Sequence, residues 1–344
     1  MSSDSVKASD LLSLVIPAHN EVEVLGQTYQ RTKSVCEAML DRGIDHELVF
    51  VNDGSTDGTT ELLDHLVERD PHVRVVHLTR NFGHQAAISA GLEVARGDLA
   101  VIIDADLQDP PEIIPKLLDH WQQGYQVVYA IRKKRKEWWG KRLAYRVFYR
   151  ILAAISEIEM PLDSGDFCVL DRSAIDLLNK LPERQRFVRG LRTWIGLRQI
   201  GVPYDRSARQ AGTPSYRFCS LVKLATDGLI SFSVEPLRMT MRLGIMGVFM
   251  AIVLGGWVFW AAFYDQKTVR GWASLACLVL LMASIQLISI GVIGEYLARV
   301  FLEVKGRPTY LIGRVSEHHV GKAKETQTPY PLMDRSLKNT GTGT

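Results

Sequence analysis

The stretch LAVIIDAD, residues 99–106, decides the fold, because five apolar residues run directly into an Asp-Ala-Asp sequence. A short, continuous apolar run is typical of a buried strand in a parallel sheet. Side chains two residues apart on a strand point to the same face, so we expect Asp104 and Asp106 to emerge side by side. They lie at the carboxyl end of the predicted strand, where open α/β sheets bind their ligands.

Two adjacent carboxylates repel each other unless a cation lies between them. Oxygen-only ligands suit Mg²⁺ or Mn²⁺, so Asp104 and Asp106 are candidate metal ligands. The alternative is a turn at the end of the strand, because the following Asp109, Pro110 and Pro111 also have the composition of a turn.

Residues 11–130 alternate between strand-like and helix-like segments. Strands are predicted at Leu12–Pro17, Glu47–Asn52, Val73–Leu78, Leu99–Asp104 and Val127–Ala130. Helical periodicity covers residues 21–41, 57–69, 84–96 and 111–123. This alternation predicts a Rossmann-like α/β domain with a mostly parallel sheet.

Polar clusters also follow the first two predicted strands, as VIPAHNE over residues 15–21 and VNDGSTDGT over residues 51–59. Each cluster alone can be explained as a turn or a helix N-cap. Together with Asp104 and Asp106 they place three acidic loops along one edge of the sheet. That arrangement suits a nucleotide whose diphosphate is held on a metal ion.

The last third of the chain contains two long runs without a charged residue, Leu243–Tyr264 and Gly271–Gly294. As helices they would each reach roughly 33–36 Å, enough to cross a hydrocarbon core of about 30 Å. Their length favours a two-helix transmembrane hairpin over a pair of buried core helices. Basic residues flank the outer ends of the runs at Arg238, Arg242, Arg299, Lys305, Arg307 and Arg314, whereas the connector holds only Lys267 and Arg270. This bias predicts a cytoplasmic α/β domain and cytoplasmic termini.

We therefore expect the following organisation: a disordered N-terminus without a signal peptide at 1–10, the α/β domain at 11–215, juxtamembrane amphipathic helices at 216–241, the two spans within 242–298, and a tail at 299–344 that is disordered after 316. The formal net charge of +3 points to no particular partner. The four scattered cysteines indicate neither a disulfide framework nor a cysteine metal site.

Residues 132–150 carry nine Lys and Arg residues, one acid and five aromatic residues. Such a segment is typical of contact with nucleic acid or with a membrane surface. The two apolar runs favour the membrane, so we expect no nucleic acid partner. An amphipathic helix over 141–155 would lie at the level of the lipid headgroups.

Further motifs are RNFGHQAAISAGL at 80–92, DADLQDPPE at 104–112, LDSGDFCVLDR at 162–172, AGTPSYRF at 211–218 and LATDGLISFSVEPLR at 224–238. Together with the motifs above, they resemble the polyprenyl-phosphate glycosyltransferases of glycosyltransferase family 2, the group of bactoprenol glucosyltransferase and dolichol-phosphate mannose synthase. The resemblance covers about residues 11–310 and implies the GT-A fold. It implies donor contacts from Pro17, Glu21, Asp53, Asp104, Arg209 and Ser215, acceptor contacts from Arg132, Arg135 and Arg217, and metal ligation by Asp104 and Asp106.

The resemblance also implies a catalytic carboxylate at Asp166, with Asp163 as the rival. A phosphate monoester has a second pKa near 6, so a lipid phosphate acceptor is already largely deprotonated at pH 7. A general base then contributes less than usual. Asp166 could instead orient the sugar or stabilise positive charge at C1, and the two roles stay open.

The implied reaction moves a sugar from a nucleotide sugar to polyprenyl phosphate at the bacterial inner membrane, with inversion and a single addition. UDP-glucose and undecaprenyl phosphate are the first choices, whereas mannose, galactose, N-acetylglucosamine and aminoarabinose donors stay open, as does a homo-oligomer. A processive polysaccharide synthase is disfavoured because residues 185–189 lack the Gln-x-x-Arg-Trp motif. A non-catalytic scaffold is disfavoured because Asp53, Asp104, Asp106 and Asp166 are all present.

Overall fold

The computed structural model describes residues 10–132, 164–184, 186–205, 235–264 and 272–318. Eight strands form one mixed sheet in the order β7-β5-β6-β4-β1-β2-β3-β8. They are β1 (Asp10–Ala18), β2 (Ile44–Asn52), β3 (Val73–Leu78), β4 (Leu99–Ile102), β5 (Val127–Arg132), β6 (Ser164–Asp171), β7 (Gln199–Tyr204) and β8 (Ile312–Glu317). Strands β4, β1, β2 and β3 run parallel, as do β5 and β7, whereas β6 and β8 are antiparallel to their neighbours.

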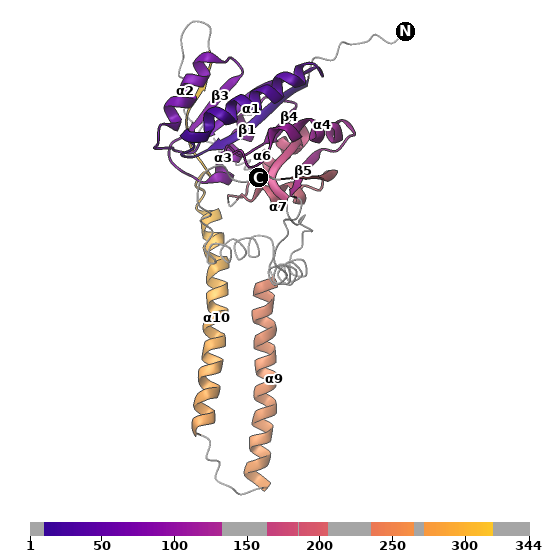
Figure 1. Cartoon of the computed structure of the whole chain (residues 1–344). Helices are drawn as coiled ribbons and strands as arrows, with labels where there is room; N and C mark the ends of the chain where they lie inside the picture. The colour runs from indigo at the N-terminus through magenta and orange to yellow at the C-terminus, as the bar shows by residue number, and fades with distance from the viewer. Residues whose placement is uncertain (1–9, 133–163, 185, 206–234, 265–271, 319–344) are drawn as a thin grey trace, which may run out of the picture.

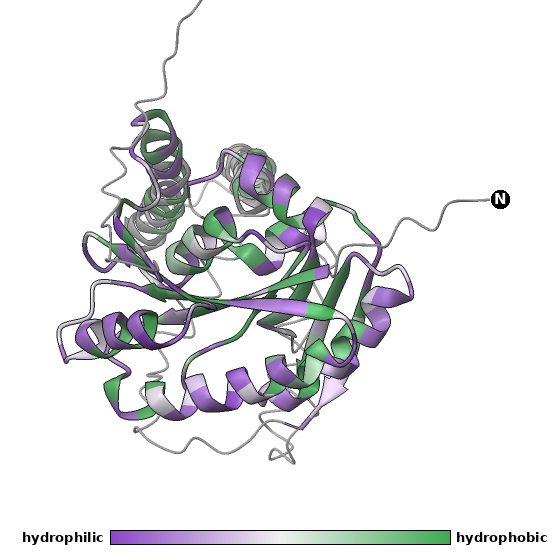
Figure 2. Cartoon of the chain, turned by 90° about the horizontal axis from the view of Figure 1, so that it is seen from above, coloured by the Kyte–Doolittle hydropathy of each residue, from purple (hydrophilic) through white to green (hydrophobic). Residues whose placement is uncertain are grey.

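Helices cover both faces of the sheet (Figures 1 and 2). They are α1 (Val22–Leu40), α2 (Thr59–Arg69), α3 (His84–Val94), the short 3₁₀ helix η1 (Pro111–Ile113), α4 (Ile114–Gln122), α6 (Arg172–Lys180) and α7 (Val188–Trp194). Leu25 of α1, Leu63 of α2 and Leu117 of α4 belong to one hydrophobic core. Ile88 of α3 and Ile175 of α6 belong to a second core on the opposite face. The apolar sequences of β3 and β4 follow from this arrangement, because both strands are buried along their whole length.

The five strands predicted between residues 11 and 130 are all present, but β4 ends at Ile102, two residues before the predicted end at Asp104. The expectation that Asp104 and Asp106 share one face of a strand is therefore wrong. Asp106 Oδ1 instead accepts a hydrogen bond from the backbone N–H of Gln108 (3.1 Å). Leu107 adopts a φ of +57°, which is rare for a bulky side chain. The two aspartates thus lie in a strained turn that follows the strand.

Strand β8 was not predicted. It lies beyond the C-terminal helices in the sequence, yet it pairs antiparallel with β3 at the edge of the sheet. It includes Ser316 and Glu317, which lie at or just past the predicted start of disorder. Arg74 of β3 fixes the end of β8, because its Nε donates a hydrogen bond to Glu317 Oε1 (3.0 Å). The sheet domain therefore includes residues 312–317, although the sequence pattern predicts that they belong to the tail.

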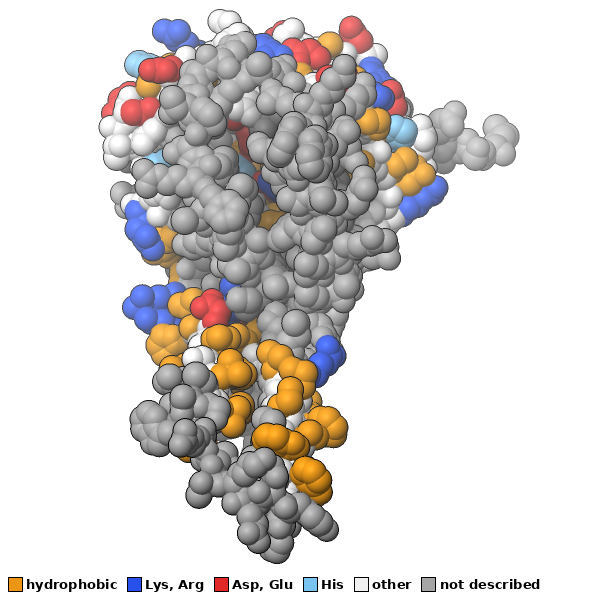
Figure 3. Space-filling view, turned by 60° about the horizontal axis from the view of Figure 1, so that its bottom comes forward, with side chains coloured by type: hydrophobic (Ala, Val, Ile, Leu, Met, Phe, Trp, Pro, Cys, Tyr) orange, Lys and Arg blue, Asp and Glu red, His pale blue; other side chains and the backbone are white. Residues whose placement is uncertain are grey.

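The C-terminal apolar runs form two long helices, α9 (Glu235–Tyr264) and α10 (Trp272–Val304), which lie side by side and project from the sheet domain (Figure 1). Figure 3 shows hydrophobic side chains along the surface of this projection. In the described part of the chain, one segment, Leu281–Val304, is long and apolar enough to cross a membrane, and none of it is buried. Large apolar side chains such as Phe249 and Leu287 are mostly exposed.

Candidate active site

The motif loops that follow β1 and β2 hold each other through backbone and side-chain hydrogen bonds. His19 Nδ1 lies 2.8 Å from the carbonyl oxygen of Asp53. The backbone N–H of Asn20 donates to Ser55 Oγ (3.1 Å), and Asn20 Oδ1 accepts from the backbone N–H of Thr56 (2.8 Å). The two loops therefore form one unit at the carboxyl edge of the sheet.

Gly54 allows this unit to pack against the loop after β3. Its φ is +64°, and a Cβ built on it would lie 2.5 Å from backbone atoms of Arg80 and Asn81. No side chain fits there, so the glycine is required by both its conformation and the close approach.

Asp53 is buried and faces the start of α3. Its two carboxylate oxygens accept hydrogen bonds from the backbone N–H groups of Phe82 (2.7 Å) and Gly83 (2.9 Å). The residue thus orders the loop that leads into α3. Of the other residues assigned to the nucleoside, Pro17 is buried in β1 and Glu21 is partly exposed just before α1.

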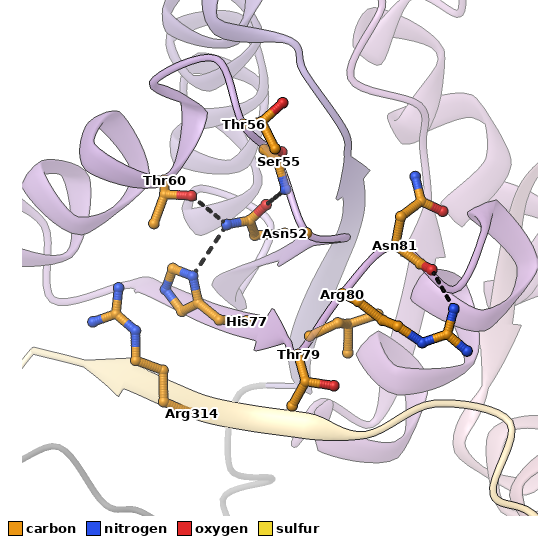
Figure 4. Close-up of a pocket in the computed structure, with 11 residues that line it drawn as sticks. Asn52, Ser55, Thr56, Thr60, His77, Thr79, Arg80, Asn81 and Arg314 are labelled. Atoms are coloured by element: carbon orange, nitrogen blue, oxygen red, sulfur yellow. Dashed lines mark hydrogen bonds between the residues drawn. The ribbon is translucent and has the colours of Figure 1, made fainter.

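A polar pocket of about 480 Å³ lies beside these loops, between the ends of β2 and β3 and the edge strand β8 (Figure 4). Its lining includes Asn52, Ser55, Arg80, Asn81 and Arg314. Asn52 orders one wall, because its Oδ1 accepts a hydrogen bond from the backbone N–H of Ser55 (3.0 Å). The pocket therefore offers amide, hydroxyl and guanidinium groups at the edge where nucleotides bind in such sheets.

Asp104 lies in an acidic cluster at the carboxyl end of β4. Burial and the negative charges of Asp166, Asp109 and Asp106 raise the pKa of the Asp104 carboxyl group to about 6, although His84 opposes the shift. Oδ1 of Asp104 is buried and receives no hydrogen bond from the residues that the structure describes. His84 Nε2 lies 3.4 Å from this oxygen.

The cluster fits a divalent cation. A buried carboxylate oxygen that receives no hydrogen bond and lies beside further carboxylates is the local environment that a cation would neutralise, and an all-oxygen donor set suits Mg²⁺ or Mn²⁺. Within the described residues, no group of three His, Cys, Asp or Glu side chains forms a complete cage. Such a cation would therefore take its other ligands from water and a diphosphate, as Mg²⁺ commonly does.

Asp166 is also buried, but it is fully partnered. Arg189 Nε donates to Oδ1 (2.7 Å) and Arg189 Nη2 donates to Oδ2 (2.9 Å). His84 Nε2 and Gln85 Nε2 each lie 3.3 Å from Oδ2. Burial raises the pKa of the Asp166 carboxyl group, but the hydrogen bonds from Arg189 and His84 outweigh it and hold the pKa well below the usual range.

Three residues of this cluster were missed by the sequence analysis. His84 and Gln85 begin α3 directly after the RNFG sequence, and Arg189 lies in the segment that we examined only for a Gln-x-x-Arg-Trp motif. The available signal for His84 and Gln85 was two polar residues at the first turn of a helix that follows a strand on the ligand-binding edge. Nothing in the local sequence pairs Arg189 with Asp166, because the contact joins two separate elements.

The structure brings together Asp53, Asp104, Asp106 and Asp166 at one edge of the sheet. The backbone of Arg132 ends β5 opposite Tyr204. The other predicted site residues, Arg135, Asp163, Arg209, Ser215 and Arg217, lie outside the described residues, as does the predicted helix over 141–155.

A mostly parallel sheet with acidic and polar loops at its carboxyl edge defines an α/β protein of the GT-A type. Residues 13–178 match the model of glycosyl transferase family 2. An uncharacterized glycosyltransferase of Bacillus subtilis is 42% identical over 306 residues, which cover 87% of this chain and 92% of the relative. A prophage bactoprenol glucosyl transferase homolog of Escherichia coli is 37% identical over 307 residues, which cover 89% of this chain and 99% of that protein.

Among solved structures, a mannosyltransferase of Pyrobaculum calidifontis in complex with GDP-Man and Mn²⁺ is 17% identical, with a TM-score of 0.46 over 83% of this chain and 86% of that one. The sequence relatives decide the family. The chain belongs to glycosyl transferase family 2 and is a glycosyltransferase, which confirms the family that the motifs predicted.

Proposed function

We propose that this glycosyltransferase moves glucose from UDP-glucose to a polyprenyl phosphate, with a divalent cation, with inversion at C1 and in a single addition. The observation that carries the proposal is the acidic cluster of Asp104, Asp106 and Asp166 at the carboxyl edge of the sheet. The acceptor and the sugar are supported by relatives named bactoprenol glucosyl transferase, 37–38% identical over nearly their whole length.

In this proposal the donor lies across the ends of β1, β2 and β4. Pro17, Glu21 and Asp53 contact the nucleoside. The polar pocket beside them supplies the side chains of Arg80 and Asn81 as hydrogen-bond donors to the nucleotide. Asp104 and Asp106 hold Mg²⁺ or Mn²⁺. When bound, such a cation neutralises charge on the diphosphate and stabilises it as the leaving group.

Asp166 acts beside the sugar as a permanent negative charge. Its low pKa makes it a poor proton acceptor at neutral pH. A base is not required, because the acceptor phosphate has a second pKa near 6 and is already largely ionised at pH 7. An ionised carboxylate can stabilise positive charge that develops at C1 as the leaving group departs.

The acceptor lipid explains the apolar helices. We propose that α9 and α10 cross the bacterial inner membrane as a hairpin, with the sheet domain in the cytoplasm. Exposed apolar side chains along α10 support this arrangement, since a surface of this kind is stable only when lipid or protein covers it. The basic loop with Arg132 and Arg135 then faces the lipid phosphate.

A panel of labelled nucleotide sugars, incubated with undecaprenyl phosphate and the full chain in detergent, tests the reaction. We expect label in the extracted lipid from UDP-glucose, dependent on added Mg²⁺ or Mn²⁺ and lost on chelation. Asp104→Asn removes a metal ligand at constant size and should abolish both transfer and metal-dependent UDP binding. Asp98→Asn, at the other end of β4, is the matched control. Transfer that survives chelation contradicts the proposal, and so does the absence of transfer from every nucleotide sugar in the panel.

A further inference from the structure

Helix α7 lies against β6 and holds the carboxylate of Asp166 in a fixed position. Arg189 binds both oxygens of Asp166 through two nitrogens of one planar guanidinium group, at 2.7 and 2.9 Å. Such a fork is geometrically specific, and a lysine cannot reproduce it. Asp166 is 5% exposed, whereas the Arg189 side chain is 35% exposed, so the carboxylate is shielded from water and the guanidinium group only in part.

The helix that carries Arg189 is anchored on both sides. Gln85 Oε1 accepts a hydrogen bond from the backbone N–H of Val188 (2.9 Å), and the amide nitrogen of the same Gln85 lies 3.3 Å from Asp166 Oδ2. Before the helix, the backbone N–H of Arg184 donates to Glu303 Oε1 of α10 (3.0 Å). Helix α7 is thus tied to α3 next to Arg189, and the segment before it contacts α10.

The described groups around Asp166 favour its ionised form, because nitrogen atoms lie within hydrogen-bond distance of both carboxylate oxygens. Arg189 donates to both oxygens, and His84 Nε2 and Gln85 Nε2 both lie against Oδ2. His84 Nε2 lies between two carboxylate oxygens, Asp166 Oδ2 at 3.3 Å and Asp104 Oδ1 at 3.4 Å. Asp166 Oδ2 has three nitrogen atoms within hydrogen-bond distance, so a proton on this oxygen would displace at least one of these contacts.

We propose that Arg189 is a positioning residue that keeps Asp166 an ionised carboxylate in one orientation, so that Asp166 acts on the sugar through its charge and not as a proton acceptor. This inference rests on the proposed function only for the place of the sugar. It assigns a role to α7 that neither the motifs nor the relatives supply.

The first test measures the ionisation of Asp166 directly. Carbon-13 spectra of aspartate-labelled full-length protein in detergent, with the Asp166 signal assigned by its loss in Asp166→Asn, should show this carboxyl ionised down to at least pH 4. In Arg189→Gln the same signal should titrate at a higher pH. An ordinary titration near pH 4 in the wild-type chain overturns the proposal, and this measurement requires no turnover.

The second test uses transfer of labelled glucose to undecaprenyl phosphate. Arg189→Gln should lower kcat by about 100-fold, as expected for a misplaced reacting group, and leave the KM for UDP-glucose nearly unchanged. Arg189→Lys keeps the charge but should not restore kcat. Added guanidinium should recover part of the activity of Arg189→Ala and none of Asp166→Asn. Arg198→Gln, at the start of β7 away from the cluster, is the matched control.

The outcomes separate the two proposals. A wild-type chain that transfers no sugar from any nucleotide defeats the proposed function, whereas the carbon-13 titration still decides the role of Arg189. Two results would assign Arg189 a merely structural role and overturn the inference. One is a wild-type kcat in Arg189→Lys. The other is a loss of kcat in Arg189→Ala that is accompanied by a loss of thermal stability and that guanidinium does not reverse.

Discussion

Two carboxylates of one cluster respond to their surroundings in opposite ways. The pKa of Asp104 is raised to about 6 by burial and neighbouring acids, whereas the hydrogen bonds of Arg189 and His84 lower the pKa of Asp166 against the effect of burial. When the surroundings of two acidic groups shift their pKa values in opposite directions, the two groups are suited to different roles. Asp104 can accept a cation that relieves its repulsion, and Asp166 already has its counter-charge within the protein.

Asp166→Asn separates a charge effect from proton abstraction. We expect the variant to fold and bind UDP and metal, and to lose about 10²–10³-fold in kcat, the scale of removing one electrostatic contact to the transition state. The loss should persist at pH 9, because the acceptor phosphate is already ionised. Steady-state kinetics between pH 6 and 9 measure this. Alkaline recovery would identify Asp166 as a general base.

Asp171 offers the control on the same strand. It ends β6, and its Oδ1 accepts a hydrogen bond from the backbone N–H of Ser173 at the start of α6 (3.0 Å). Because asparagine caps a helix about as well as aspartate does, Asp171→Asn should change stability only slightly and retain kcat.

At the scale of elements, the loop after β2 depends on a backbone conformation and a close approach that only glycine allows. Gly54→Ala should destabilise the fold by more than the roughly 1–2 kcal/mol of a left-handed conformation, because its Cβ also meets the backbone of Arg80 and Asn81 at 2.5 Å. Gly43→Ala is the matched control, since Gly43 has a φ of +73° with nothing within 4 Å of the added Cβ. Urea unfolding and UDP titration should show a larger loss of stability and weaker binding for Gly54→Ala alone.

The sequence predicts local elements well and long-range partners poorly. Val73–Leu78 was predicted with the bounds that the structure has, because a doubly covered strand leaves a continuous apolar run. The end of β4 was misplaced because the apolar run continues through Ile103 after the strand has ended in a turn. Strand β8 and the pairing of Arg189 with Asp166 were missed because both depend on contacts between distant segments, for which a single sequence contains no local pattern.

The edge strand β8 covers a histidine whose neutral form the fold favours. Burial and the charge of Arg314 lower the pKa of His77 to about 4, although Asp64 opposes this. Below pH about 6.5 the unfolded chain binds a proton that the folded chain does not. Stability is therefore fully present above pH 6.5 and falls as the pH drops toward 4, by at most about 3 kcal/mol.

Urea unfolding of the wild-type chain and of His77→Gln at pH 7.5 and pH 5 tests this dependence. We expect His77→Gln to lose less stability between the two pH values than the wild-type chain does. An equal loss in both chains would show that His77 does not contribute to the pH dependence.

At the scale of the whole molecule, the sheet domain and α10 differ in how much of their apolar surface they bury. The sheet domain buries its apolar residues in two cores, whereas the 24-residue segment Leu281–Val304 buries none of its length. As a helix of roughly 36 Å this segment exceeds the hydrocarbon core of about 30 Å. Arg299 and Lys305 lie near the carboxyl end of α10, and under the positive-inside rule we propose that this end faces the cytoplasm.

Cysteine labelling in membranes tests this topology. In a background with Cys219 and Cys277 replaced by serine, the remaining Cys36 and Cys168 are buried and should not react. Glu68→Cys on exposed α2 and Lys305→Cys after α10 should react with an impermeant maleimide only when the membrane is opened, and Lys267→Cys between the helices should react in intact cells. We expect this pattern because the basic segments that flank the two helices stay in the cytoplasm, whereas the short connector between the helices crosses the membrane. Reaction of Lys267→Cys only after opening would mean that α9 and α10 do not cross the membrane, and the lipid phosphate would then have to reach the cluster from a surface on which both helices lie flat.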